Sequence, residues 1–191
     1  MSGPENADTD FSWIDYAAKV NNEMIANFGN LVNRTLAQIK KHFEAGLEPP
    51  KSLTKEDKAL LSAAEDSFNV VGELIAVAKF REALQKVFEL IAEANKYLNV
   101  NEPWKRIKED KNDAGRSLFV AGQIIKCLGV LVEPFLPEAA RKIKDVLGVA
   151  DADFVWQYPA LKTIVVGDVV PLYKKIEQAQ VDAELDKLGK A

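Results

Sequence analysis

Residues 21–41 read NNEMIANFGNLVNRTLAQIKK, and this stretch decides the fold because its apolar side chains recur with helical spacing. At 3.6 residues per turn, one side of a helix gathers Met24, Ile25, Phe28, Leu31, Val32, Thr35, Leu36, Ile39 and Phe43. The pattern predicts a helix that is buried along one face. Ser12 can cap it just before Trp13, so we expect the helix to run to about His42, with the rest of the chain as its support.

The opposite face of this helix has an unusual composition for a surface that merely meets water: Asn27, Asn30, Arg34, Ala37 and Lys41. Asparagine is a mediocre helix former, and glutamate or lysine would serve better on a solvated face. Asn30 and Arg34 lie four residues apart and project from the same side, where an amide and a guanidinium could bind the edge of a flat polar ligand. The alternative is that these residues make capping or inter-helix hydrogen bonds.

Composition predicts a single domain with a substantial core. The chain has 191 residues, of which 48% are hydrophobic and 28% charged. Its formal net charge of -4 argues against a protein that holds nucleic acid by charge alone. Any contact with RNA must therefore be local, and we expect no DNA partner.

Cysteine and hydropathy patterns indicate a protein of a reducing, aqueous compartment. Cys127 is the single cysteine, so no disulfide framework exists, and its apolar surroundings predict a core residue. The longest apolar stretch, Leu118–Leu131, is interrupted by Gln123 and Lys126 and is shorter than a typical membrane span. The N-terminus is acidic and polar, unlike a signal peptide. We expect a soluble, cytoplasmic protein without a membrane partner.

The remaining periodicity predicts an all-α fold. After a turn at GLEPPKS (46–52), a helix is expected over about 55–78, with Thr54 as its N-cap and Asp57 at the third position. Further helices are expected over about 79–97, 114–135 and 137–148, the last ending at a glycine, and Pro103 opens a short helix between the first two of these. Residues 151–171 hold two prolines and a β-branched run, which predicts an extended connector with at most a short strand. A last amphipathic helix is expected over 171–188.

Trp104 is the second unusual residue, because a large aromatic side chain stands in a polar connector directly after Pro103. One interpretation is that it anchors the connector to the bundle. The other is that it forms an aromatic platform for an unpaired base, with Lys105, Arg106 and Lys108 beside it to neutralise phosphates.

Sequence signatures of catalysis and metal binding are missing. The HExxH, CxxC and EF-hand spacings do not occur, and the single histidine, His42, cannot supply the Glu-x-x-His pairs of di-iron bundles. No GxGxxG, GxxxxGK[ST] or GxSxG motif is present. We therefore predict no catalytic residue, metal ligand or cofactor in this chain.

Four segments resemble one known family in order and spacing, along nearly the whole chain. They are NFGNLVNRT (Asn27–Thr35), ANKYLNVNEPW (Ala94–Trp104), LVEPFLPEAARKI (Leu131–Ile143) and PLYKKIE (Pro171–Glu177). Together they resemble the anticodon-binding domain of methionyl-tRNA synthetase, a class I aminoacyl-tRNA synthetase. The Asn-Leu-x-x-Arg and Pro-Trp elements carry most of the specificity, and the related domains of the Leu, Ile, Val and Cys enzymes are less similar at both.

The resemblance implies a helix bundle of the class I synthetase type, with an extended connector and a C-terminal helix, that recognises the CAU anticodon of methionine tRNAs. Asn30 and Arg34 would contact anticodon bases, and Trp104, supported by Pro103, would stack under the first base, the cytosine. Asn99 would belong to the same site, although some family members carry Asp there, which makes a charge-based role doubtful. Contacts with the RNA backbone are expected from Lys41, Lys105, Arg106 and Lys108.

The family's catalytic half, with its HIGH and KMSKS motifs, has no counterpart here. The chain alone should therefore be inactive, and the parent polypeptide would be a methionine–tRNA ligase whose ATP, and any zinc, bind the missing half. The catalytic domain and methionine tRNA are thus the implied partners in protein biosynthesis. The expected division is a disordered or added lead (1–11), an anticodon-binding bundle (12–150), and a connector with a helix packing back (151–191). The chain is then a cut-out domain or a natural stand-alone homologue.

A non-catalytic helical scaffold for protein docking is the rival hypothesis. The two functions differ in what they require of Asn30, Arg34 and Trp104. RNA binding requires these side chains on one accessible surface, whereas a buried Trp104 would favour the scaffold.

Overall fold

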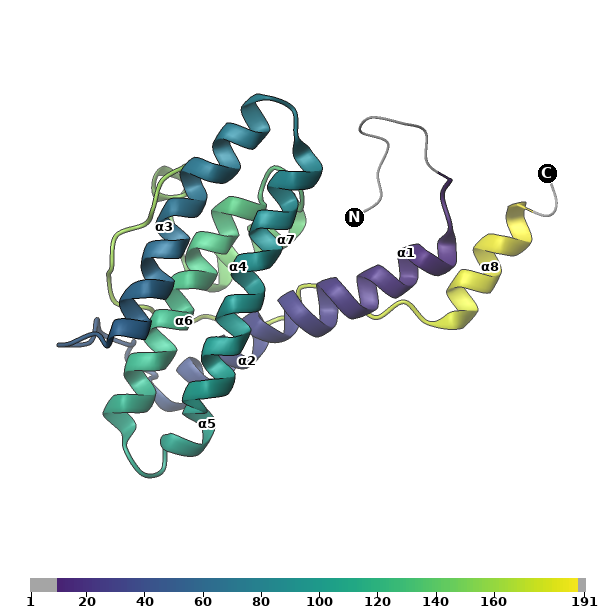
Figure 1. The fold of residues 1–191 in the computed structure, drawn as a ribbon. Coiled ribbons are helices and arrows are strands. Elements are labelled where there is room, and N and C mark those ends of the chain that lie inside the picture. The colour runs from purple at the N-terminus through teal and green to yellow at the C-terminus, as the bar shows by residue number, and fades with distance from the viewer. Residues whose placement is uncertain (1–9, 189–191) are drawn as a thin grey trace.

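Helices form almost all the regular structure of the computed structural model, which describes residues 10–188 (Figure 1). The first three elements form one continuous helical run, made of α1 (Trp13–Lys19), a π-helix η1 (Val20–Gly29) and α2 (Asn30–His42). It is followed by α3 (Lys55–Ala76), α4 (Phe80–Asn101), the short α5 (Pro103–Arg106), α6 (Lys111–Val132), α7 (Pro137–Val146), one 3-10 turn η2 (Asp151–Asp153) and α8 (Gln178–Leu188). The predicted all-α fold is confirmed.

The first helical run spans the predicted residues but is not one regular α-helix. Ser12 caps it as expected, because its Oγ accepts a hydrogen bond from the Asp15 N–H at 3.2 Å. The middle of the run is instead wound as the π-helix η1, which the apolar periodicity did not predict. Gly29 ends this segment, and the ring of Tyr173 lies 3.7 Å from the position that a Cβ at Gly29 would occupy.

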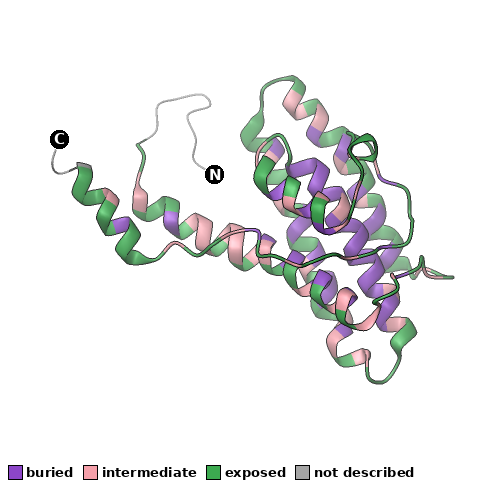
Figure 2. Ribbon diagram, turned by 180° about the vertical axis from the view of Figure 1, so that it is seen from behind, coloured by how far each residue is buried: buried purple, intermediate pink, exposed green. Residues whose placement is uncertain are grey.

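Helix α6 is the centre of the bundle and is covered by α2, α3, α4 and α7 (Figure 2). By length and composition alone it could cross a membrane, but most of it is buried inside the protein. Cys127 lies in this helix and is completely buried, as predicted, and its burial raises the pKa of the thiol to about 12. The most apolar segment of the chain is therefore the core of the fold.

Local capping and proline positions explain several helix starts. Thr54 and Asp57 form the capping box of α3, with the Asp57 carboxylate accepting from the Thr54 N–H at 2.8 Å. Helix α6 begins at Lys111, earlier than predicted, because the Asp110 carboxylate caps its first turn. Helix α4 runs past the predicted end to Asn101. Pro103 opens α5 and Pro137 opens α7, as their positions in the sequence predicted.

The C-terminal segment differs most from the prediction. The connector is extended, as predicted, and contributes one antiparallel bridge between Leu47 and Ile164. The last helix begins at Gln178 rather than at Pro171, because the Asn21 side chain bonds both the N–H and the carbonyl of Ile176, at 3.0 and 2.9 Å, and holds the chain extended. Helix α8 packs against α1, and the pair forms an arm that projects from the bundle (Figure 1). The predicted lead, residues 1–11, lies almost entirely outside the described residues.

Candidate nucleic-acid interface

Arg34 and Trp104 meet in space although they are far apart in the chain. The centre of the Arg34 guanidinium lies 4.4 Å from the centroid of the Trp104 ring, which is a cation–π contact. Arg34 comes from the second turn of α2 and Trp104 from α5, directly after the buried Pro103. Both side chains are only partly buried. Helix α2 therefore lies beside α5 and also contacts α4, although these elements are far apart in the chain.

A pair of asparagines joins η1 to α4. The Asn95 Nδ2 of α4 donates to the Asn27 side-chain oxygen at 2.9 Å and to the Asn27 carbonyl at 3.2 Å. The inter-helix hydrogen bond that was the alternative interpretation of the polar face is therefore correct for Asn27. Asn99 lies in α4 one helical turn beyond Asn95 and is exposed. It therefore stands between Asn95 and Trp104 along the chain.

Asn30 is exposed and lies one turn before Arg34 on α2. It borders a shallow hollow of about 190 Å³ that it shares with Asn33, Gly29 and the segment 171–173. Within the described part of the chain, the Asn30 side chain makes no hydrogen bond. Its amide can therefore bind a ligand at this edge without first breaking an internal contact.

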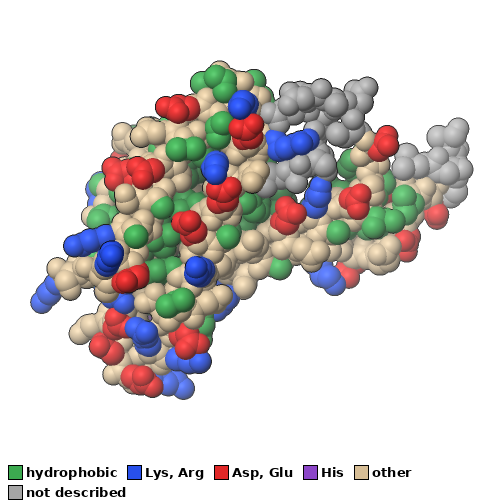
Figure 3. Space-filling model, viewed as in Figure 1, with side chains coloured by type: hydrophobic (Ala, Val, Ile, Leu, Met, Phe, Trp, Pro, Cys, Tyr) green, Lys and Arg blue, Asp and Glu red, His purple; other side chains and the backbone are tan. Residues whose placement is uncertain are grey.

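The four predicted backbone-binding cations differ in how far they are already paired. Lys105 Nζ lies 2.6 Å from a Glu102 oxygen, and Arg106 lies 2.5 Å from an Asp113 oxygen. Lys108 and Lys41 are exposed. Partial burial, and then the charges of Lys41 and Lys111, lower the pKa of the neighbouring His42. On the face that Figure 3 shows, acidic and basic side chains are interspersed, which agrees with local rather than general attraction for RNA.

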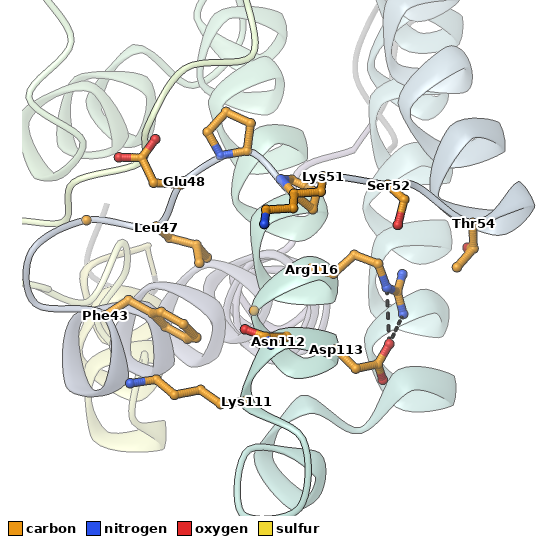
Figure 4. Close-up of a pocket in the computed structure, with 14 residues that line it drawn as sticks. Phe43, Leu47, Glu48, Lys51, Ser52, Thr54, Lys111, Asn112, Asp113 and Arg116 are labelled. Carbon is orange, nitrogen blue, oxygen red and sulfur yellow. Dashed lines mark hydrogen bonds and ion pairs between the residues drawn. The ribbon is translucent and has the colours of Figure 1, made fainter.

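A larger hollow of about 720 Å³ lies at the start of α6 (Figure 4). The loop that was predicted only as a turn forms one wall with Lys51, and the Phe43 ring forms another, with Lys111 Nζ 5.1 Å from the ring centroid. Asp113 and Arg116 line the hollow as a bonded pair, drawn with dashed lines in Figure 4. Sequence reasoning missed this pair, because neither residue stands out by spacing.

Of the triplet Asn30, Arg34 and Trp104, the last two are in contact at the surface, and Asn30 is exposed one helical turn before Arg34. Trp104 packs against the core cluster along part of its surface but is not buried, and a guanidinium covers its ring. Among residues 10–188, no three His, Cys, Asp or Glu side chains are grouped so that they could hold a metal ion.

Comparisons with known proteins agree with this geometry. Residues 1–36 match the family described as tRNA synthetases class I (M), and residues 49–189 match the anticodon binding domain of methionyl tRNA ligase. The fold is similar to that of the free methionyl-tRNA synthetase of Mycobacterium tuberculosis, with a TM-score of 0.80 at 22% identity over 87% of this chain and 35% of that one. These matches define the class as a helical domain of a class I tRNA synthetase.

Curated relatives narrow the class further. The chain is 34% identical to the methionine–tRNA ligase of Chloroflexus aurantiacus over 98% of its own length and 36% of the relative's. It is also 34% identical to that of Pyrococcus horikoshii, over 93% of its length and 25% of the relative's. This chain belongs to the family of anticodon-binding domains of methionyl-tRNA ligase, which confirms the resemblance seen in the sequence. It spans about a quarter to a third of the length of these relatives.

Proposed function

We propose that this chain binds the CAU anticodon of methionine tRNAs through the edge formed by α2, the end of α4 and α5. The observation that carries the proposal is the 4.4 Å contact between the Arg34 guanidinium and the Trp104 ring. It brings together the two unusual features of the sequence at an accessible edge of the bundle. The family match and the exposed amides of Asn30 and Asn99 support the same function.

In this proposal the Trp104 ring is a platform for one unstacked base. The fixed φ of the preceding Pro103 limits the backbone freedom that the ring loses on binding, and base–aromatic stacking contributes about 1–3 kcal/mol per base. In the free protein the planar guanidinium of Arg34 lies over the face of the ring. On binding, the base takes this stacking position and Arg34 turns its donors toward the base.

Cytosine suits these partners because its Watson–Crick edge offers two acceptors beside one amino donor. The fork of Arg34 can donate to both acceptors, and an asparagine amide can supply either a donor or an acceptor. Asn30 and Asn99 are placed to complete the contacts with the cytosine or its neighbour. Lys41 and Lys108 attract the phosphates, which fits a net charge of -4 because only a few local cations are needed.

The arm of α1 and α8 gives this domain its second partner, the catalytic part of the parent methionine–tRNA ligase. The class I synthetase family matches residues 1–36, which include α1 and η1. Phe11, Ile14 and Tyr16 are exposed along the arm, where an apolar partner surface would cover them. ATP, and any zinc of the parent enzyme, would bind in that part, and the cytoplasm would be the site of the reaction.

Filter binding at a stated salt concentration tests the proposal. The domain is titrated with methionine tRNA and with the same tRNA body carrying another anticodon, because phosphate contacts are then equal and only the bases differ. We expect tighter retention of the CAU form. Arg141→Gln, which removes an exposed cation from α7, is the matched control and should keep the preference. Equal retention of both tRNAs by the unmodified chain would refute anticodon recognition.

A further inference from the structure

A chain of ion pairs runs from the surface at α5 to the core of the bundle. Arg106 Nη1 bonds one carboxylate oxygen of Asp113 at 2.5 Å, and Arg116 Nη2 bonds the other at 2.7 Å. Arg116 also pairs with Asp57, which accepts a hydrogen bond from the Tyr97 hydroxyl at 2.6 Å. Side-chain exposure falls along this chain from 43% at Arg106 to 29% at Asp113, 12% at Arg116 and 0% at Asp57.

The inner end of this chain is firmly held. Burial by itself would raise the pKa of Asp57, but hydrogen bonds from Tyr97, the Thr54 backbone and Arg116 lower it overall. Hydrogen bonds from Arg106 and Arg116 likewise lower the pKa of Asp113. Both carboxylates are therefore ionised at neutral pH, and Asp113 connects a fixed guanidinium in α6 to one in α5.

Helix α5 needs such a connection because local forces define it poorly. It has four residues, fewer than an isolated helix needs to be stable. The residue before it, Glu102, has a φ of 42°, a left-handed conformation that is unfavourable for a residue with a side chain and persists only where the surroundings impose it. Trp104 lies in this helix, two residues before Arg106.

We propose that Asp113 is a positioning residue, which holds α5 through Arg106 and thereby fixes the orientation of the Trp104 ring. The inference assigns Arg106 a different role from the phosphate contact predicted for it, since its guanidinium is engaged with Asp113. The effect that Asp113 should have on RNA binding rests on the proposed function. If the ring is a platform for a base, loosening α5 weakens stacking although no RNA contact is removed.

Asp113→Asn tests the proposal sharply because charge and positioning predict opposite results. Removal of a negative charge beside an RNA site should by itself strengthen binding. Loss of positioning should weaken binding of the CAU anticodon stem-loop by about three- to tenfold, part of the value of one stacked base. Asp145→Asn is the matched control, because it removes an exposed carboxylate of α7 that is also paired with an arginine. It should not weaken RNA binding.

The position of the ring is measured separately by ¹⁹F NMR of full-length protein that carries 5-fluorotryptophan. The Trp104 signal is assigned from Trp104→Phe, and Trp13 and Trp156 serve as internal references. We expect Asp113→Asn to shift or split the Trp104 signal and to leave the other two in place. Arg106→Gln, which breaks the same connection at its surface end and leaves Arg116 paired with Asp57, should do the same and carries the test if Asp113→Asn folds poorly.

The outcomes separate the two claims. An unchanged Trp104 signal in both variants overturns the positioning role, whatever happens to RNA binding. A shifted signal with RNA affinity unchanged supports the positioning role and counts against Trp104 as a base platform. A shifted signal with weaker binding that is non-additive with Trp104→Ala supports both.

Discussion

Trp104 and Trp156 are both partly exposed, but their surroundings give them different uses. The Trp156 indole N–H donates to the Phe68 carbonyl at 3.1 Å, and the ring stands edge-on to Phe68 with centroids 5.9 Å apart. Its Nε1 also lies 3.1 Å from where a Cβ of Gly72 would be, so the ring fits against the α3 backbone. The ring of Trp104 is instead covered by an arginine side chain from another helix.

The difference teaches that exposure alone does not distinguish an anchor from a binding platform. The contacts of Trp156 are with backbone and core, and no ligand could replace them without disturbing α3. The guanidinium over Trp104 is a planar group that a base can replace. Trp104 also packs against the core, as the anchoring interpretation expected, but a guanidinium lies over its ring. The two regions also differ in polar support, since ion pairs connect α5 to α6, whereas a neutral hydrogen bond holds Trp156.

The largest expected effect concerns the ionic support on the Trp104 side. Asp57→Ala leaves the largely buried Arg116 without its inner partner, so we expect a loss of about 3–5 kcal/mol in the free energy of unfolding. Denaturant unfolding at neutral pH measures it. Glu138→Ala, in an exposed pair, should change stability by no more than about 0.5 kcal/mol. A similarly small change for Asp57→Ala would show that the ionic network adds little.

The Asp57 carboxylate should also make the unfolding free energy depend on pH, and Asp57→Ala tests this. The pKa of Asp57 in the folded protein lies below its ordinary value of 3.8, so this carboxylate stabilises the fold fully above that pH. Its contribution is lost as the pH falls below 3.8 toward the folded-state pKa. The unfolding free energy of the unmodified protein should therefore fall more steeply through this range than that of Asp57→Ala, as acid titrations followed by circular dichroism would show.

Trp104→Ala should weaken binding of the CAU anticodon stem-loop by about ten- to a hundredfold, the value of one stacked base. Trp104→Phe should keep part of the affinity, because a smaller ring can still stack. Thermal melts run beside the titrations separate binding from folding. A Trp104→Ala protein that melts far lower but binds normally when folded would remove the contrast with Trp156.

Arg34→Lys keeps the charge beside Trp104 but loses the planar fork of donors. We expect the preference for the CAU anticodon to fall by about tenfold, because the value of a charge-assisted hydrogen bond, about 1.5–3 kcal/mol, is lost in part. The salt dependence of binding should change little, since the number of cations is the same. Binding titrations of both tRNAs at several salt concentrations test this. Full discrimination by the lysine variant would mean that charge is sufficient.

Trp156→Phe should have the smallest effect and only on stability. The change removes the hydrogen bond to the Phe68 carbonyl while keeping an aromatic ring, so a loss of about 1 kcal/mol is expected. Affinity for the CAU stem-loop, corrected for the folded fraction, should be unchanged. Weakened binding by this variant would place Trp156 in the RNA site and contradict the distinction drawn between the two tryptophans.

Local signals predicted much of the helical pattern. The Thr54–Asp57 capping box, Pro137 at the start of α7 and the left-handed Gly148 beyond its end all act within a few residues. The Asp110 cap was equally local, and a search for it would have placed the start of α6 correctly. The start of α8 could not be predicted in this way, because the bonds that keep the chain extended to Ile176 come from Asn21.

In the candidate site, too, the sequence identified some features and distant contacts decided others. Composition alone drew attention to Asn30, Arg34 and Trp104, since each is an unusual choice for its local element. It could not separate Asn27, whose amide bonds Asn95, from Asn30, whose amide is exposed. Both asparagines occupy the same predicted face, and only the approach of α4 distinguishes them.

The sequence by itself determined the helical class, the buried stripe of α2 and the core position of α6, because periodic apolar residues and end caps act over one or two turns. Tertiary structure alone decided that Arg34 covers Trp104, that Arg106 turns inward to Asp113, and that α8 packs on α1. These contacts join residues that are distant in the chain or compete for the same partners. Their outcome depends on how the helices cross, which no local pattern specifies.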